Sequence, residues 1–325
     1  IGQQHVTDTL RAQLQSGRLS HAYLFTGTRG TGKTTCAKIL ARAVNCEHPV
    51  NGDPCNECAA CRGILDGSVL DVTEIDAASN NGVDNIRDLR DETRYTPAQV
   101  RKRVFIIDEV HMLSIGAFNA LLKTLEEPPE HVLFILATTE LHKVPATILS
   151  RCQRFDFRRI GAEDISRRLL DVAAGEGIAL TEGAARLIAR LADGAMRDAL
   201  SMLDRAAAAG AVDEKTVTAA LGAMGQDDGI RLAEHLKTGD LAAAVGLLDE
   251  YYNAGRDLAS VYDQMLGLIR DALLVKTSKT DVSALISPAY SVKTLQALCD
   301  GLASSTLIAW SRIISDSLDH MRTAA

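Results

Sequence analysis

The chain of 325 residues is 46% hydrophobic and 24% charged, which is ordinary for a globular protein with room for about two or three domains. Its formal net charge of −7 argues against a free-standing nucleic-acid-binding protein, because such proteins are usually basic. The sequence contains no stretch of about 18 uncharged apolar residues, and its first residues lack the pattern of a signal peptide. We therefore expect no membrane partner.

The first chemical signal along the chain is a complete G-x-x-x-x-G-K-[ST] phosphate-binding loop (P-loop). An apolar run at 22–26 precedes it and predicts a buried strand, and the apolar spacing of 35–44 predicts a helix after it, which is the context that the motif requires. Glycines let the backbone approach phosphates, and N–H groups at the helix start point at them. A flexible glycine-rich turn is the alternative that these flanks disfavour. The residues expected to bind nucleotide are Gly27, Thr28, Gly30, Thr31, Gly32, Lys33, Thr34 and Thr35.

Two residues of the loop have roles of their own in this prediction. Lys33 would reach the β and γ phosphates, and the Thr34 hydroxyl would ligate Mg²⁺. A nucleotide site indicates a cytoplasmic protein with reduced thiols.

Four of the seven cysteines lie between residues 46 and 61. Because reduced cysteines in a cluster indicate a metal rather than disulfides, four thiolates on a tight loop predict a closed, structural Zn²⁺ site. The final C-x2-C-x2-C spacing also occurs in iron–sulfur proteins, and unmetallated thiols are the third possibility. The expected zinc ligands are Cys46, Cys55, Cys58 and Cys61.

Strands and helices alternate up to about residue 160. Buried strands are expected at 22–26, 69–75, 104–107, 132–137 and 154–157, and helices at 1–20, 35–44, 83–95 and 118–125. This alternation predicts an α/β fold with a doubly wound parallel sheet.

Only helical patterns follow. We expect a nucleotide-binding domain at 1–160, a small helical domain at 161–224 and an all-α domain at 225–325, joined by a linker around Gly222, Gly225 and Gly229. The core positions expected in the last domain are Leu232, Leu236, Leu241, Val245, Leu247 and Leu248.

An acidic pair directly follows the strand at 104–107. Side chains at the carboxyl end of a parallel strand face the crevice where ligands bind, so Asp108 would hold Mg²⁺ opposite Thr34 and Glu109 would polarise an attacking water. An acidic pair that merely closes a strand is the alternative. Thr138 and Thr139 end the next strand, where a hydroxyl could orient the water or simply finish the strand.

Two arginines extend the site. Arg151, in Ser150-Arg151-Cys152, could serve the nucleotide of a neighbouring subunit as an arginine finger in trans, although the pattern alone favours a surface ion pair. Arg197 lies in the first turn of a helix, where a cation opposes the helix dipole. A γ-phosphate held between two domains would compensate for that placement.

Together these residues resemble the gamma/tau family of bacterial DNA polymerase III, the AAA+ ATPases of the sliding-clamp loader. The specific parts are 27–34, the four-cysteine insertion, 107–113, 119–129, 150–152 and 194–200, whereas 226–325 matches only in general character. The resemblance implies a P-loop ATPase with ATP, Mg²⁺ and Zn²⁺ as cofactors. It implies that Arg151 is the trans finger, Arg197 the second sensor and Thr139 the first sensor, and that 161–224 is a lid and 225–325 an oligomerising collar.

The resemblance also implies partners. ATP binding would open the beta clamp in a ring with the delta and delta-prime subunits and other copies of this chain, and hydrolysis would release the clamp onto primer–template DNA. Backbone contacts would hold the DNA, with Arg87 and Lys123 as the expected residues, in a cytoplasmic, nucleoid-associated protein. Part of the adenine pocket is expected ahead of Ile1, and the gamma and tau forms are not distinguished.

Two other functions compete with this one. An ATP-binding scaffold that does not turn over would be expected to lack one of Lys33, Asp108, Glu109 or Arg197, and all four are present. A helicase or Holliday-junction motor of the same superfamily is disfavoured by the four-cysteine insertion.

Overall fold

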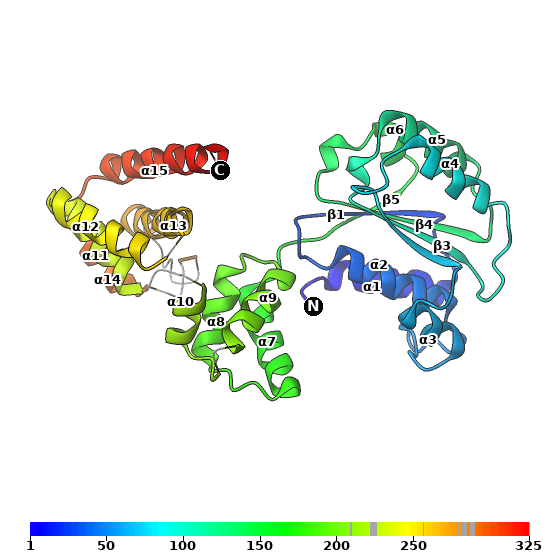
Figure 1. Ribbon diagram of the computed structural model, residues 1–325, viewed down its shortest axis with the longest axis horizontal. Helices are drawn as coiled ribbons and strands as arrows, with labels where there is room; N and C mark the ends of the chain where they lie inside the picture. The colour runs from blue at the N-terminus through cyan, green and yellow to red at the C-terminus, as the bar shows by residue number, and fades with distance from the viewer. Residues whose placement is uncertain are drawn as a thin grey trace. The chain divides into compact units, whose positions relative to one another are not determined.

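The computed structural model describes residues 1–208, 210–221, 226–255, 257–278, 280, 282, 285–286 and 290–324 (Figure 1). The chain divides into two units, which are described separately. The first consists of residues 1–177 and 185–203, and the second of 178–184 and 204–325. The three-domain division at 160/161 and 224/225 stays a prediction, and its second boundary falls in 222–225, outside the described residues.

The first unit is built on five parallel strands in the order β2-β3-β4-β1-β5, as the alternation of strands and helices predicted. Their register aligns Thr26 with Thr138 and Asp76 with Asp108, so the carboxyl ends of the central strands meet at one edge. The strands are β1 (Ala22–Thr26), β2 (Val72–Asp76), β3 (Arg103–Asp108), β4 (Val132–Thr138) and β5 (Gln153–Asp156).

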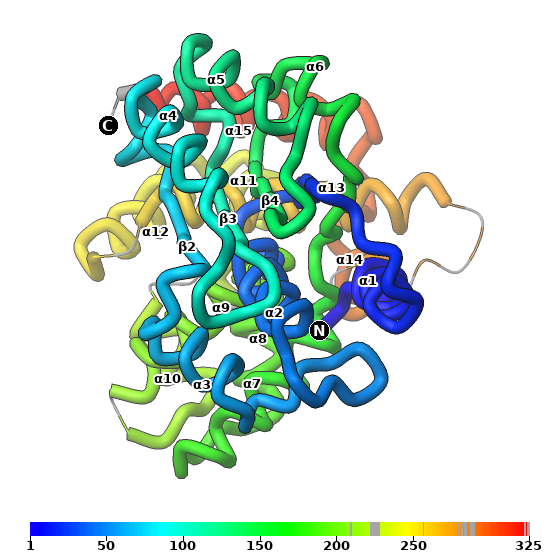
Figure 2. The backbone as a smooth tube through the Cα atoms, turned by 90° about the vertical axis from the view of Figure 1, so that its right-hand side faces the viewer, coloured from blue at the N-terminus to red at the C-terminus, as the bar shows by residue number. Residues whose placement is uncertain are grey.

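Both faces of the central strands β1, β3 and β4 are buried, because these strands are continuous apolar runs whose side chains alternate between the faces. Phe105 and Ile107 pack beneath α4 (Val83–Glu92), α5 (Ile115–Glu126) and α6 (Ala146–Leu149). Val104 and Ile106 pack against α1 (Gln4–Ser16) and α2 (Lys33–Asn45). Figures 1 and 2 both show the sheet between these two layers of helices.

The remaining elements of the first part of the chain are short. Helix α3 (Ala59–Asp66) belongs to the four-cysteine insertion, and two single 3-10 turns, η1 (Val110–Met112) and η2 (Leu141–Lys143), follow β3 and β4. Ser114 caps the start of helix α5, since its hydroxyl accepts a hydrogen bond from the Ala117 N–H at 3.2 Å. The helix ends at Glu126, before Pro128 and Pro129.

The named elements in the described part of the chain after β5 are all helices, as the sequence predicted, and a single β-bridge joins Leu180 to Val212. The helices are α7 (Ala162–Glu176), α8 (Glu182–Leu191), α9 (Met196–Ala207), α10 (Glu214–Leu221), α11 (Gln226–Thr238), α12 (Leu241–Asn253), α13 (Leu258–Thr277), α14 (Val292–Cys299) and α15 (Ser304–Ala324). Within the described part of the chain, none of the helices has the length and apolar character needed to cross a bilayer.

Two expectations for the second unit were wrong. Leu241 and Val245 are 68% and 64% exposed, because they lie on a different face of α12 from the buried Ala244 and Leu247. Gly229 lies within helix α11 rather than in a linker, whereas Gly222 and Gly225 lie outside the described residues.

Candidate nucleotide-binding site

The phosphate-binding loop joins β1 to α2 in a backbone shape that favours glycine. Gly27, Gly30 and Gly32 have φ values of +147°, +77° and +96°. Neighbouring segments also exclude a side chain, since a Cβ on Gly30 would lie 2.7 Å from the Ala195 Cβ. Gly32 precedes α2 and offers no side-chain cap, so the N–H groups of the first turn point into the loop, as an anion requires.

Lys33 fills the inside of this loop. Its Nζ donates hydrogen bonds to the carbonyl oxygens of Gly27 at 2.8 Å and Thr28 at 2.9 Å, and the residue is 6% exposed. Burial lowers the pKa of Lys33, while the nearby carboxylates of Glu109 and Asp108 raise it. The Lys33 ammonium therefore lies inside the loop, where a bound phosphate could accept the hydrogen bonds that the Gly27 and Thr28 carbonyls accept in the structure.

Thr34 and Asp108 meet across the end of the sheet. The Thr34 hydroxyl donates to Asp108 Oδ2 at 2.6 Å, and Asp108 Oδ1 accepts the Glu109 N–H at 2.9 Å. The structure thus brings together the two oxygen ligands that the sequence assigned to Mg²⁺. Hydroxyl and carboxylate oxygens fit the preference of that ion.

Glu109 is held by the end of the next strand. Its backbone is left-handed, with φ +46°, and its Oε2 accepts hydrogen bonds from the Thr139 hydroxyl at 2.9 Å and the Thr139 N–H at 3.2 Å. Thr138, by contrast, is fully buried. Of the two threonines, Thr139 is therefore the one in contact with the carboxylate.

His111 belongs to the same group, and the sequence analysis missed it. Its Nδ1 lies 3.0 Å from the Thr138 hydroxyl and 3.3 Å from Glu109 Oε2, and its Nε2 lies 3.3 Å from Glu140 Oε1. The only sequence signal was its place two residues after Glu109. Because the buried His111 ring contacts all three side chains, it restricts the positions of Glu109, Thr138 and Glu140.

The start of α9 packs directly on the phosphate-binding loop. The Met196 N–H donates to the Gly30 carbonyl at 2.9 Å, and the Ile160 N–H donates to the Gly194 carbonyl at 3.1 Å. These contacts place Arg197 in the wall of the same cavity as Lys33. The predicted meeting of this arginine with the phosphate site is therefore present in the first unit.

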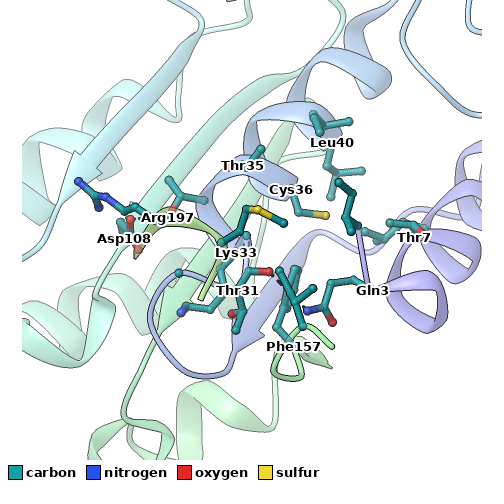
Figure 3. A pocket seen from close by; sticks show the side chains of 18 of the residues that line it. Gln3, Thr7, Thr31, Lys33, Thr35, Cys36, Leu40, Asp108, Phe157 and Arg197 are labelled. Atoms are coloured by element: carbon teal, nitrogen blue, oxygen red, sulfur yellow. Dashed lines mark hydrogen bonds between the residues drawn. The ribbon is translucent and has the colours of Figure 1, made fainter. Parts of the chain in front are cut away.

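A cavity of about 1020 Å³ joins these residues. Figure 3 shows Lys33, Asp108 and Arg197 toward one end and side chains of α1 and α2 toward the other. Gly27 and Thr28 are not among the lining residues, and they act through the carbonyls that hold Lys33. Lining residues outside the predicted set include Ile1, Gln3, Thr7, Arg29, Asp76, Phe157, Ile160, Arg168, Met196 and Leu200.

The first residues of the chain help to form the cavity. The Gln3 side chain donates to the Arg158 carbonyl at 2.6 Å and accepts the Arg158 N–H at 3.1 Å, and it lies 3.4 Å from the Thr31 carbonyl. It therefore ties the beginning of α1 to both the loop and the segment after β5. The sequence offered no signal for this contact, because Gln3 and Arg158 are 155 positions apart.

Arg151 lies away from the cavity of its own chain. Its guanidinium contacts Glu126 Oε1 at 2.7 Å and the Thr147 carbonyl at 2.8 Å. Within one chain this is the surface ion pair that the pattern alone favoured. A role in trans stays a prediction.

The two residues expected to contact DNA lie on neighbouring helices. Arg87 on α4 is exposed and pairs with Asp84 at 2.9 Å, and Lys123 is exposed on α5. Helices α4 and α5 pack against each other. Both cations therefore lie on the helical layer that covers one face of the sheet, and their contact with DNA stays a prediction.

The four clustered cysteines converge. The Sγ atoms of Cys46, Cys55, Cys58 and Cys61 all lie within 4.8 Å of one another, and tetrahedral Zn²⁺ with bonds of about 2.3 Å needs sulfurs roughly 3.8 Å apart. Backbone N–H groups of Glu57 and Cys58 lower the pKa of Cys55 to about 6, whereas burial raises the pKa of Cys61 to about 12. The donor set fits a structural metal ion.

Three family models match consecutive parts of the chain. They are described as DNA polymerase III, delta subunit (residues 2–161), DNA polymerase III clamp loader subunit, ATPase lid domain (164–212), and DNA polymerase III subunits gamma and tau domain III (212–325). The chain belongs to the clamp-loader AAA+ ATPase family of DNA polymerase III gamma and tau subunits.

Curated relatives agree with these models. DNA polymerase III subunit tau of Bacillus subtilis is 54% identical over 86% of this chain and 50% of its own length. The Escherichia coli subunit tau is 45% identical over 86% of this chain and 44% of its own length. The Mycobacterium tuberculosis subunit gamma/tau is 37% identical over 100% of this chain and 57% of its own length. This chain spans about half the length of the clamp-loader subunits it matches.

Solved structures show the same fold at greater distance. The Thermotoga maritima RuvB Holliday junction branch migration motor superposes with a TM-score of 0.53 at 17% identity, covering 76% of this chain and 82% of that one. A single-residue variant of the same protein superposes with a TM-score of 0.52 at 16% identity, covering 76% of this chain and 80% of that one. At such identity the likeness concerns the AAA+ fold alone.

Proposed function

We propose that this chain is the ATPase motor subunit of the sliding-clamp loader, and that it uses ATP binding and hydrolysis to open the clamp and place it on primer–template DNA. The observation that carries the proposal is the contact of Thr34 with Asp108 at 2.6 Å beside the buried Lys33. This arrangement supports phosphoryl transfer, in which positioning and charge stabilisation supply most of the catalysis.

Each residue around the cavity has a part in this proposal. Loop N–H groups and Lys33 bind the β and γ phosphates, while Thr34 and Asp108 would hold Mg²⁺, which neutralises phosphate charge when bound. Glu109 orients the attacking water and accepts its proton. The Thr139 hydroxyl, 2.9 Å from Glu109 Oε2, positions that carboxylate.

The two arginines would act from different chains. Arg197 lines the cavity of its own chain and is proposed to contact the γ-phosphate as the second sensor. Arg151, held by Glu126 outside that cavity, is proposed to complete the nucleotide site of a neighbouring copy. A guanidinium added in trans stabilises the charge of the transition state, so hydrolysis would depend on assembly.

The proposed partners follow from the family. They are the delta and delta-prime subunits, the beta clamp, other copies of this chain and primer–template DNA, in the cytoplasm at the nucleoid. Zn²⁺ would occupy the four cysteines as a structural ion. Arg87 and Lys123 are the proposed contacts to the DNA backbone, and the collar of residues 225–325 would hold the ring together.

The test is steady-state ATP hydrolysis by the chain alone and with delta, delta-prime, the clamp and primed DNA. We expect slow turnover alone, strong stimulation by the full set, and loss of that stimulation in Arg151→Ala with nucleotide binding by the isolated chain unchanged. Turnover that stays flat after every addition would favour a scaffold subunit. Weakened binding in isolated Arg151→Ala would contradict the role in trans.

A further inference from the structure

A group of polar side chains joins Glu109 to a second carboxylate, that of Glu140. His111 lies between them on η1, and Glu140 directly follows Thr139. The His111 side chain is 6% exposed and the Glu140 side chain 37%, and neither residue lines the cavity. A buried ring therefore separates the proposed water-orienting carboxylate from one to which the proposed function gives no part.

The contacts around His111 indicate which ring nitrogen carries the proton. The Thr138 hydroxyl, which is fully buried, accepts the Glu140 N–H at 3.0 Å and lies 3.0 Å from His111 Nδ1. Of these two partners only Nδ1 can accept the hydroxyl proton, because an amide N–H is a donor alone. Nδ1 is therefore an acceptor, which places the proton of the neutral ring on Nε2.

Glu140 is the partner of that proton. Its Oε1 lies 3.3 Å from His111 Nε2, and Lys143 Nζ lies 3.0 Å from Oε1 and 2.9 Å from Oε2 of the same carboxylate. The hydrogen bond from Lys143 holds the pKa of Glu140 below its ordinary value, so the side chain is an ionised acceptor at neutral pH. A hydrogen bond at one ring nitrogen of a histidine selects the tautomer at the other.

The tautomer matters because Glu109 faces the same ring. Glu109 Oε2 lies 3.3 Å from His111 Nδ1, and it accepts hydrogen bonds from the Thr139 hydroxyl at 2.9 Å and the Thr139 N–H at 3.2 Å. A proton on Nδ1 would be donated to this carboxylate and would tie it to the ring. A proton on Nε2 adds no donor to Glu109, whose remaining lone pairs stay available to a water molecule.

We propose that Glu140 is a positioning residue for hydrolysis, which accepts the His111 Nε2 proton and so keeps the ring from hydrogen bonding to Glu109. The Thr139 hydrogen bonds and the packing of the ring then fix Glu109, while the carboxylate stays free to orient the attacking water. This inference rests on the proposed ATPase function. It gives Glu140 a part in the rate of turnover that is exerted through His111.

The first test measures the tautomer directly. The whole chain is produced with isotopically labelled histidine, long-range proton–nitrogen NMR correlations of the rings are recorded, and His111→Gln identifies the His111 signals. We expect the proton on Nε2 in the wild-type chain, and a partial or complete change to Nδ1 in Glu140→Ala. Glu140→Gln should keep the wild-type tautomer, because its amide oxygen can accept the same proton.

The second test measures turnover in the assembly with delta, delta-prime, the clamp and primed DNA. Glu140→Ala should lower kcat about fivefold and leave the ATP affinity of the isolated chain unchanged, whereas Glu140→Gln should keep most of the rate. When Glu140→Ala is combined with His111→Gln, kcat should fall no further than in His111→Gln alone, because one residue acts through the other.

Glu74→Ala is the matched control. The Glu74 side chain is 42% exposed and also pairs with a lysine, Lys38, at 2.7 Å, but it lies on β2 and does not line the cavity. This variant should leave both the tautomer and kcat unchanged. Thermal unfolding of each variant shows whether a lower rate reflects lower stability, and should Glu140→Ala fail to fold, the wild-type tautomer decides.

Two results would overturn the positioning role. They are a wild-type ring with a proton on Nδ1, alone or together with one on Nε2, and a kcat in folded Glu140→Ala that equals the wild-type value. A wild-type assembly that does not hydrolyse ATP would instead overturn the proposed function itself. The two failures are distinguishable, because the tautomer is measured without turnover.

Discussion

The two ends of the sheet are both rich in buried polar groups, but they use them differently. At the amino end, the Asp71 carboxylate accepts the N–H groups of Ala98 and Gln99 and pairs with Arg103, all at 2.9 Å. At the carboxyl end, the Lys33 ammonium donates hydrogen bonds to the loop carbonyls of Gly27 and Thr28, and Glu109 has a left-handed backbone. Groups that satisfy one another stabilise the fold, whereas groups arranged around a cavity are available to a ligand.

The comparison teaches where a substitution should act. Changes at the amino end should lower the free energy of unfolding and leave nucleotide affinity intact. Changes at the carboxyl end should remove binding or turnover at little cost in stability.

The largest expected effect is at Lys33. Lys33→Ala should remove measurable nucleotide binding, because no other residue places an ammonium inside the loop among the described residues. Calorimetry with ADP and Mg²⁺ measures the binding, and thermal unfolding measures stability. If Lys33→Ala lost binding together with a large part of its stability, the proposed difference between the two ends of the sheet would be contradicted.

The second effect is at Asp71, which is 3% exposed. Asp71→Ala removes the carboxylate partner of Arg103 and should cost about 3 kcal/mol of stability. Denaturant unfolding measures this cost, and the ADP affinity of the folded protein should be unchanged. The matched control is Asp84→Ala, which removes an exposed pair of the same length and should cost less than about 1 kcal/mol. Equal costs would contradict the account.

The third effect is at His111, which contacts both Glu109 and Glu140. His111→Gln should lower kcat about tenfold by releasing the Glu109 carboxylate, with ATP affinity unchanged. His142→Gln is the control, because the exposed His142 also approaches Glu140, at 3.6 Å, without contacting Glu109. A loss of stability without a change in kcat would make His111 a structural residue only.

The smallest effect is the pH dependence of the amino end. Burial would raise the pKa of Asp71, but hydrogen bonds from Gln99 and Ala98 and the Arg103 guanidinium outweigh it and hold the pKa below its ordinary value. Its stabilisation is therefore present above the unfolded pKa of about 3.9 and is lost as the pH falls through the folded pKa. The difference in Tm between wild type and Asp71→Asn should shrink from pH 7 to pH 3, and a constant difference would contradict this.

What could be predicted from the sequence depended on whether a feature is local or joins distant parts of the chain. Central strands such as 104–107 and 132–137 are continuous apolar runs, and the phosphate-binding loop and the cysteine cluster are contiguous motifs, so local pattern was enough. Pairs distant in the sequence left no such pattern, among them Gln3 with Arg158 and Asp71 with Arg103. Leu241 and Val245 were misplaced because a helix that is apolar on several faces does not reveal which face is buried.

The central claim is that this site hydrolyses ATP through Glu109. Its most direct test is Glu109→Gln, assayed for ATP binding by the isolated chain and for turnover with delta, delta-prime, the clamp and primed DNA. The account predicts that ATP affinity stays near the wild-type value, since Gln keeps the shape and an acceptor for Thr139, while turnover falls by about 10²-fold or more. Turnover equal to that of the wild type would contradict it.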